Sequence, residues 1–202
     1  MPRASIGALS GLSARAMATL TSRSPCPVDT YRSIASEMAA TDLRGEAAEP
    51  VRRRFNAYYG VRRNAMWREL FYSRFEAAKA SRLQGAELFV DIVVGLQADT
   101  GRIEASFASK LVATLQPEHP IIDSVVRKWL AKHTTPPPFK GGVERVIAYY
   151  RWLDAFMVEL AASREAERWS TTFEAAFPTR PGAVPIPAMK RLDFLIWAGA
   201  DR

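Results

Sequence analysis

Apolar residues recur every three or four positions along most of this 202-residue chain, which is the period of an α-helix. The clearest run follows Asn64, a residue suited to cap a helix, and its apolar members are Met66, Trp67, Leu70, Phe71, Phe75 and Ala78. A second long run follows Gly141 and Gly142 and extends from Val143 to Leu160. These spacings predict two amphipathic helices, each with one face in the core.

The same period predicts shorter helices at residues 31–38, 47–58, 103–115, 122–130, 170–176 and 189–200. Residues 86–97 are rich in β-branched side chains, so a strand is possible there, but the helical surroundings favour a buried helix. The prolines of residues 134–138 and 178–187 predict an extended linker and a loop. No internal repeat or convincing β-hairpin is present, and we predict an all-α fold.

Residues 1–28 differ from the rest of the chain, because they are rich in Ala, Ser, Thr and Arg and no acidic residue precedes Asp29. One weak amphipathic face is possible here, made of Ile6, Leu9, Leu12 and Leu20. This composition is typical of a transit peptide, and a disordered leader or a start codon placed too far upstream accounts for it equally well. We predict a flexible or leader-like segment at 1–28 and one helical domain at 29–202.

Several classes of protein are disfavoured by the composition. No apolar run approaches the roughly 20 residues of a membrane span, so we expect a cytoplasmic protein with no membrane partner. The single cysteine, Cys26, excludes an internal disulfide, a Cys-based zinc site and an iron–sulphur cluster. With only two histidines, His119 and His133, a His-rich metal centre is not expected either. We predict no cofactor and no metal.

The net charge of +7 indicates a polyanionic partner, with nucleic acid as the first candidate. Arginine supplies 22 of the 28 basic residues, and its planar guanidinium suits phosphates and base edges. A GC-rich genome, which enriches Arg and Ala together, would produce the same bias.

Residues 51–64 interleave five arginines with aromatic rings. The arginines are Arg52, Arg53, Arg54, Arg62 and Arg63, and the rings are Phe55, Tyr58 and Tyr59. Guanidinium groups bind phosphates and aromatic rings stack on exposed bases, so this segment is a candidate nucleic-acid surface. The alternative is a helix pair with core aromatics and solvated arginines, partly neutralised by Glu46 and Glu49.

The segment from Ser106 to Leu130 predicts a helix, a turn with two prolines, and a second helix with Asp123 in its first turn. On its own, Asp123 is explained as a helix cap that pairs with Arg127 one turn later. The segment also resembles the helix–loop–Asp region of the helix-hairpin-helix DNA glycosylase superfamily. The stretches YYGVRRNAMWRELF and RLDFLIW are similar to sequences around this motif in a bacterial branch of glycosylase-like proteins.

The resemblance implies that Asp123 stabilises the cationic sugar as an N-glycosidic bond breaks, and helps to position or activate water. The sequence departs from the superfamily at the hairpin. In the superfamily, a Leu-Pro-Gly-x-Gly-type turn lets backbone amides approach a phosphate. Here the corresponding stretch is ADTGRIEASFASK, in which Gly101 is the only glycine. If the hairpin is remodelled, Ser106, Ser109 or Lys110 would supply the phosphate contacts instead; the alternative is that the hairpin is absent.

Bifunctional members of the superfamily carry a nucleophilic lysine in this helix, and the resemblance places Ser106 near that position. We therefore predict a solvated or phosphate-contacting Lys110 and no lyase chemistry. His119 is expected to be an ordinary turn residue, and Glu104 to pair with an arginine from elsewhere.

These observations predict a DNA-binding protein, in first place a monofunctional base-excision glycosylase-like hydrolase. It would act on duplex DNA with the target base flipped into an aromatic-lined pocket. We expect Asp123 in a concave pocket with a basic rim. The DNA contacts would come from the five arginines with Ser109, Lys110 and Arg127. A non-catalytic DNA-binding or adaptor module is the alternative, and a helical protein-interaction domain is a third reading.

Overall fold

The structure, a computed structural model, describes residue 9 and residues 11–201, so the predicted position of Ile6 lies outside the described residues. The described part of the chain is all-α, as predicted, and contains no strand. Among these helices, none is both long and apolar enough to cross a membrane. The helices are α1 (Ser13–Ser22), α2 (Pro27–Ala40), η2 (Glu46–Ala48), α3 (Glu49–Tyr59), α4 (Ala65–Lys79), α5 (Gly85–Thr100), α6 (Ala105–Leu115), α7 (Ser124–His133), α8 (Val143–Ala161), α9 (Arg164–Ala176) and α10 (Ala188–Gly199).

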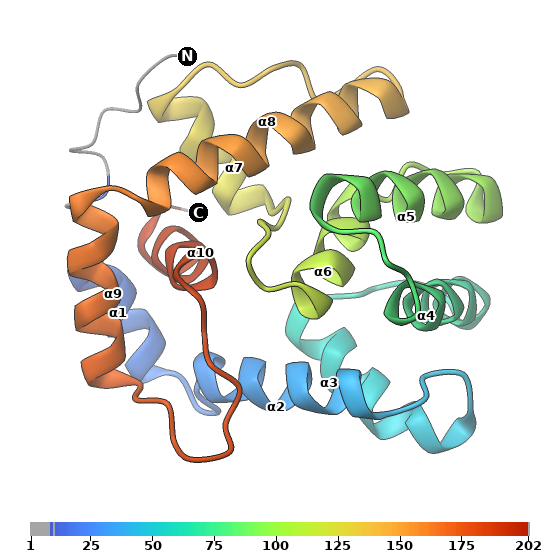
Figure 1. Cartoon of the computed structure of the whole chain (residues 1–202), viewed down its shortest axis with the longest axis horizontal. Helices are drawn as coiled ribbons and strands as arrows, with labels where there is room; N and C mark the ends of the chain where they lie inside the picture. The colour runs from blue at the N-terminus through green and yellow to red at the C-terminus, as the bar shows by residue number, and fades with distance from the viewer. Residues whose placement is uncertain (1–8, 10, 202) are drawn as a thin grey trace.

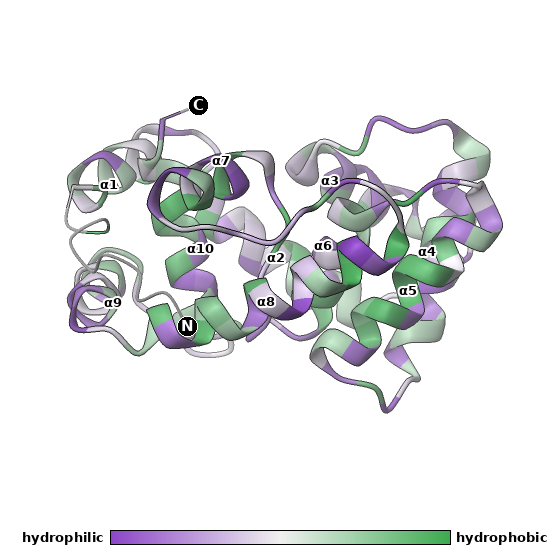
Figure 2. Ribbon diagram, turned by 90° about the horizontal axis from the view of Figure 1, so that it is seen from above, coloured by the Kyte–Doolittle hydropathy of each residue, from purple (hydrophilic) through white to green (hydrophobic). Residues whose placement is uncertain are grey.

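The helices form two groups that α2 and α8 connect (Figures 1 and 2). One group contains α1, α7, α9 and α10, and the other contains α3, α4, α5 and α6. Helix α8 packs on α5 in one group and on α10 in the other, while α2 packs on α3 and α6 and its Tyr31 ring meets Phe194 of α10. The buried side chains of both groups belong to one continuous apolar cluster. The connecting helices therefore make a single core out of the two groups.

Local sequence signals set several of the helix ends. Gly60 and Gly101 follow α3 and α5 in the left-handed conformation, with φ of 64° and 68°, which glycine adopts without steric penalty. The side chain of Asn64 accepts a hydrogen bond of 2.9 Å from the Trp67 amide at the start of α4. Helix α9 begins at Arg164 rather than at the predicted residue 170, because Ser163 caps it and accepts from Ala166 N at 3.2 Å.

The segment at 86–97 is helical, as the prediction favoured. Helix α5 buries Leu88, Phe89, Ile92 and Val93, which lie three or four positions apart on one face. The β-branched residues did not produce a strand, because tertiary packing of an apolar face outweighs small differences in propensity.

The described part of the N-terminal segment is folded, and Leu9 is among its buried residues. Helix α1 lies against α10, and the side chains of Ala16 and Leu20 are completely buried there. The two helices approach so closely that a Cβ built on Gly199 would lie 2.7 Å from the carbonyl oxygen of Leu12. The flexible segment that we predicted therefore contains an integral part of the core.

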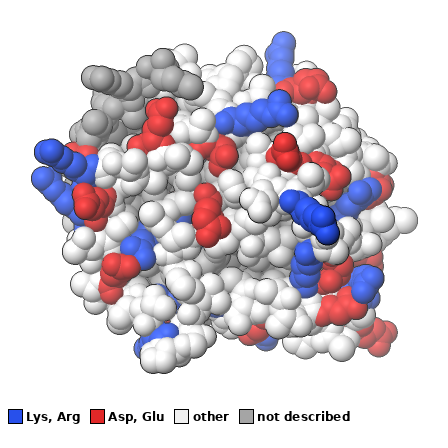
Figure 3. All heavy atoms as spheres, in the orientation of Figure 1, with Lys and Arg blue, Asp and Glu red and all other residues white. Residues whose placement is uncertain are grey.

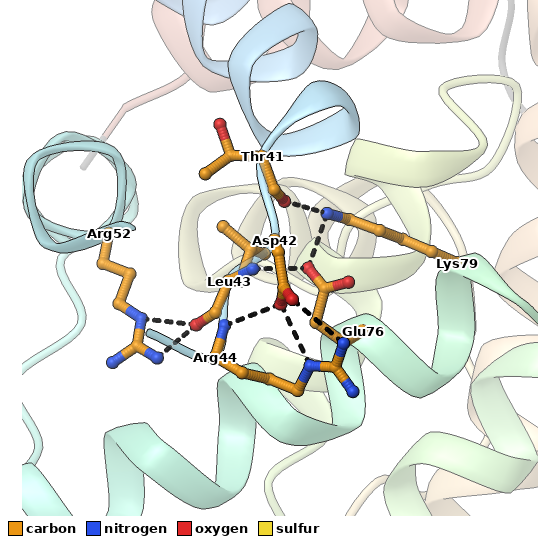
Figure 4. A network of polar contacts seen from close by, with 7 residues as sticks. All are labelled: Thr41, Asp42, Leu43, Arg44, Arg52, Glu76 and Lys79. Atoms are coloured by element: carbon orange, nitrogen blue, oxygen red, sulfur yellow. Dashed lines mark hydrogen bonds and ion pairs between the residues drawn. The ribbon is translucent and has the colours of Figure 1, made fainter. Parts of the chain in front are cut away.

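A network of hydrogen bonds fixes the loop between α2 and η2 (Figure 4). The Arg52 guanidinium donates to the Leu43 carbonyl, with an Nε–O distance of 2.7 Å. Lys79 Nζ donates to the Thr41 carbonyl at 2.6 Å, and the Leu43 amide donates to Glu76 at 2.7 Å. Side chains of α3 and α4 thus satisfy three polar groups of the loop backbone, namely the Thr41 carbonyl and the amide and carbonyl of Leu43.

Candidate functional site

A cavity of about 1000 Å³ is lined by residues of α2, α3, α6 and α10, four of the helices labelled in Figure 1. The link between α1 and α2 and the loop before α7 complete its wall. We call it the central cavity. Its lining includes Arg23, Asp29, Arg54, Tyr58, Tyr59, Lys110, Asp123, Lys190, Asp193, Phe194 and Trp197. The volume is at the upper end of the range for small-molecule sites.

Asp123, the predicted catalytic residue, is the N-cap of α7 and lies on the wall of the central cavity. Its Oδ1 accepts a hydrogen bond of 2.7 Å from the Val125 amide. No described residue donates a hydrogen bond to the other carboxylate oxygen. One oxygen of Asp123 therefore holds the helix end, and the second is available to a ligand.

The position of Asp123 is fixed from α6. The Ser109 hydroxyl, which is completely buried, accepts a hydrogen bond of 2.9 Å from the Ile122 amide and donates to the Ser106 carbonyl at 3.0 Å. The predicted phosphate contact of Ser109 has no support in this geometry, because both bonding directions of the hydroxyl are used internally.

Lys110 lies on the wall of the central cavity and is only 9% exposed. Its Nζ donates to the Tyr59 carbonyl at 2.9 Å and lies over the rings of Tyr59 and Phe107. Burial lowers the pKa of Lys110, and the attraction of Asp123 and Asp193 opposes this shift. The prediction of a solvated Lys110 is wrong, because α3 supplies a carbonyl acceptor that draws the side chain inward.

A second lysine on the cavity wall was missed by the sequence interpretation. Lys190 is 3% exposed and Asp193 is 8% exposed, and their side chains form an ion pair of 2.6 Å within α10. Burial lowers the pKa of Lys190, but the attraction of Asp193 and of nearby tyrosines together keeps it above its ordinary value. The available signal was a Lys and an Asp three positions apart in an otherwise apolar helix.

Arginines and aromatic rings occupy other parts of the cavity wall. The guanidinium of Arg23 lies 5.2 Å from the ring centroid of Trp197. Arg54 is exposed and pairs with Glu37 of α2. Burial raises the pKa of Glu37, but the hydrogen bonds from Arg54 and Ser33 and the charge of Arg54 together lower it below its ordinary value. The cavity thus combines exposed arginines with an interior of lysines, aspartates and rings.

The five arginines of residues 51–64 do not act as one surface. Arg52 is 5% exposed and bonded within the protein, to the Leu43 carbonyl and Glu69. Arg63 forms two hydrogen bonds to Glu104, of 3.1 and 3.0 Å, so the predicted arginine partner of Glu104 is present. Only Arg53, Arg54 and Arg62 are exposed, and the first and last of these have no ion pair with any described residue.

Arg127 is the remaining predicted DNA contact. Its guanidinium lies 3.8 Å from the ring centroid of Phe139, and it forms no ion pair with Asp123. The two residues are joined only through the backbone, where the Arg127 amide donates to the Asp123 carbonyl at 2.9 Å. The expected pairing of Asp123 and Arg127 is wrong, because the linker at 134–139 offers the guanidinium an aromatic partner. His119, expected to be an ordinary turn residue, pairs with Asp154 at 2.9 Å.

Charge is distributed rather than concentrated on the face shown in Figure 3, where acidic and basic side chains are interspersed. The net positive charge of the chain therefore does not form a single basic patch on that face. Within residue 9 and residues 11–201, no three Asp, Glu, His or Cys side chains gather as a metal site.

No family model, no curated protein and no solved structure matches this chain.

Proposed function

We propose that this protein binds DNA and hydrolyses the N-glycosidic bond of a damaged or modified base, as a divergent member of the helix-hairpin-helix DNA glycosylase superfamily. The observation that carries the proposal is the position of Asp123. The residue that the sequence resemblance selects lies on the wall of a cavity of about 1000 Å³, beside aromatic rings. A flipped nucleotide needs such a concave, aromatic-lined site.

Asp123 has the chemical properties that this reaction requires. Cleavage of an N-glycosidic bond develops positive charge on the sugar, and a nearby carboxylate stabilises it. The cap to Val125 holds Oδ1 in place, so the free oxygen can face the sugar or accept a proton from water. The bond between Ser109 and Ile122 fixes the loop that carries this carboxylate. Such preorganisation is the main source of electrostatic catalysis.

The contacts to the DNA backbone would differ from those of the superfamily. Helices α5 and α6 form a hairpin, but the carboxylate of Glu104, only 6% exposed, lies at the start of α6. Glu104 is paired with Arg63, so this arginine is not available to a phosphate at the hairpin. We therefore assign the backbone contacts to exposed arginines, namely Arg53 and Arg62 with Arg54 and Arg23 near the cavity.

The test is mass-spectrometric detection of free bases released from heavily damaged or modified duplex DNA. Asp123→Asn is the informative variant, because asparagine caps a helix as well as aspartate and so preserves α7. Asp91→Asn, an exposed aspartate of α5 away from the cavity, is the matched control. We expect release by the wild type and by the control, and a loss of at least 100-fold in Asp123→Asn.

A non-catalytic DNA-binding module is the second candidate, and the occupied Oδ1 of Asp123 favours it, since capping alone explains the residue. This candidate predicts DNA binding that weakens with salt and no base release from any substrate. Release that is equal in wild type and Asp123→Asn would refute the mechanism. A protein that neither releases bases nor binds DNA at low salt would refute both candidates.

A further inference from the structure

The described positive and negative side chains are equal in number in the interior of the central cavity. The arginines of the cavity are exposed to solvent. Two lysines, Lys110 and Lys190, and two aspartates, Asp123 and Asp193, line the interior. Each lysine is nine-tenths or more buried, and Lys110 experiences the charges of both aspartates. A free anion in this interior would gain from the lysines and lose to the aspartates. The balance suits an uncharged polar ligand better than a phosphate.

One face of α10 is directed at the cavity. Lys190, Asp193, Phe194 and Trp197 all line it, and their spacing of three, four and seven positions is that of a single helical face. The face presents a cationic donor, an anionic acceptor and two aromatic rings. This combination provides hydrogen bonding to the edge of a planar ligand beside an aromatic wall.

Stability alone does not account for an ion pair at this position. Removing two charges from water costs several kcal/mol per ion, and apolar residues of similar volume are often as stable or more stable. The Lys190–Asp193 pair is nevertheless kept on the wall of a cavity rather than inside the close-packed core. The Asp193 carboxylate bonds to Lys190 through Oδ2, and no described residue donates to its other oxygen. A ligand can therefore use the second oxygen.

We infer that the Lys190–Asp193 pair recognises the edge of an uncharged nitrogen heterocycle in which a hydrogen-bond acceptor adjoins an N–H donor. Lys190 donates to the acceptor and Asp193 accepts from the N–H, while Phe194 and Trp197 belong to the aromatic wall beside the pair. Nucleobases carry such an edge, so the inference deepens the proposed function and rests on it for the ligand class. The pair acts in recognition, separately from the role of Asp123 at the sugar.

The experiment is isothermal titration calorimetry on the full chain with uracil, thymine, cytosine, adenine and hypoxanthine, and with inorganic phosphate as the anionic probe. The variant is Lys190→Met/Asp193→Leu, which replaces the pair by apolar residues of similar volume. The control is Arg74→Gln/Asp99→Asn, which removes an ion pair of 2.7 Å between α4 and α5, outside the cavity. Lys190→Leu/Asp193→Ala, which also removes both the donor and the acceptor, is a second variant in case the first does not fold.

We expect at least one heterocycle to bind the wild type and the control equally, and the variant at least tenfold more weakly. This factor corresponds to about 1.4 kcal/mol, the size expected for losing a hydrogen bond to a charged group. The inference is overturned if no heterocycle binds the wild type. It is also overturned if the variant binds as tightly as the wild type, or if phosphate binds in the cavity and the heterocycles do not.

Base release from DNA separates this inference from the proposed function. Heterocycle binding that depends on the pair, without release from any DNA, would support the inference and refute the glycosylase proposal. Equal rates of release by wild type and Lys190→Met/Asp193→Leu would support the glycosylase proposal and refute the inference.

Discussion

The hydroxyl of Ser109 in α6 accepts a hydrogen bond of 2.9 Å from the backbone amide of Ile122, one residue before Asp123. This bond joins the middle of a buried helix to the loop that presents the candidate catalytic carboxylate. Ser109 is completely buried, so water cannot replace its hydroxyl. The position of Asp123 therefore depends on a side chain 14 residues earlier in the chain, which does not itself line the cavity.

Ser109→Ala should destabilise the protein by about 1–3 kcal/mol, because it leaves the Ile122 amide buried without a partner. Urea denaturation measures the change, with Thr171→Ala as the control. Thr171 donates to its own helix but is exposed, so its loss should cost less than about 0.5 kcal/mol. If both variants have the same stability as wild type, Ser109 does not anchor the loop.

Arg52 and Arg53 are neighbours in the sequence with opposite environments. Arg52→Gln should lower the free energy of unfolding by about 1–3 kcal/mol, because the Leu43 carbonyl loses its donor. Arg53→Gln should leave stability within about 0.5 kcal/mol and reduce the slope of log affinity for DNA against log salt by about one. Denaturation and a salt titration of DNA binding test both expectations. An unchanged salt slope for Arg53→Gln would remove this residue from the proposed DNA surface.

Gly199→Val should separate α1 from α10, because a Cβ at this position would lie 2.7 Å from the Leu12 carbonyl oxygen. We expect destabilisation of about 1–3 kcal/mol, typical of overpacking. We also expect faster proteolysis within residues 11–28. Gly11→Ala is the control, since nothing lies within 4 Å of a Cβ there. Limited proteolysis followed by mass spectrometry checks the result, and a wild-type cleavage pattern would contradict the close packing of the two helices.

Tyr31→Phe tests the stability of the protein at alkaline pH. Burial raises the pKa of Tyr31, opposed by the charge of Lys190, and no described residue hydrogen-bonds to its hydroxyl. A phenol with a raised folded-state pKa contributes stability that is complete below its unfolded pKa of about 10 and is lost as pH rises further. The free energy of unfolding of Tyr31→Phe should therefore equal or exceed that of wild type at pH 7, and it should fall less than that of wild type at pH 11.

The control for this prediction is Tyr72→Phe. Burial also raises the pKa of Tyr72, but its hydroxyl bonds to Asn56 at 2.7 Å, so this variant should already be destabilised at pH 7. Urea denaturation at the two pH values gives the comparison. A larger alkaline loss in Tyr31→Phe than in wild type would show that the sign of the linkage is wrong.

The Lys190–Asp193 pair predicts a non-additive effect on stability. Asp193→Leu alone should cost about 3–5 kcal/mol, because it leaves a buried ammonium group without its counter-ion. The double replacement Lys190→Met/Asp193→Leu should recover most of this loss. A double-mutant cycle from denaturation curves measures the coupling. Additive losses would indicate that the two side chains do not interact in solution.

The helical content and several helix ends were determined by the sequence itself. The period of apolar residues predicted α3, α4, α6, α7 and α8, and caps such as Asn64 and Asp123 act within a few residues of their own position. These signals are local, because the interacting groups lie within a few residues of each other in the sequence. The prediction was less accurate for α9, where the apolar face is narrow and the start depends on Ser163.

The tertiary structure alone decided which polar residues face the cavity and which hold the fold. Arg52 and Arg53 are the same type of residue, yet Arg52 is buried with its guanidinium bonded to the Leu43 carbonyl, and Arg53 is exposed to solvent. Lys110 is drawn inward by the Tyr59 carbonyl, 51 positions earlier in the chain. The sequence of α1 suggested a leader, and its burial depends on α10 at the other end of the chain. The period of apolar residues indicates which side of a helix is apolar. It does not indicate contacts between residues far apart in the sequence, which form only when the whole chain folds.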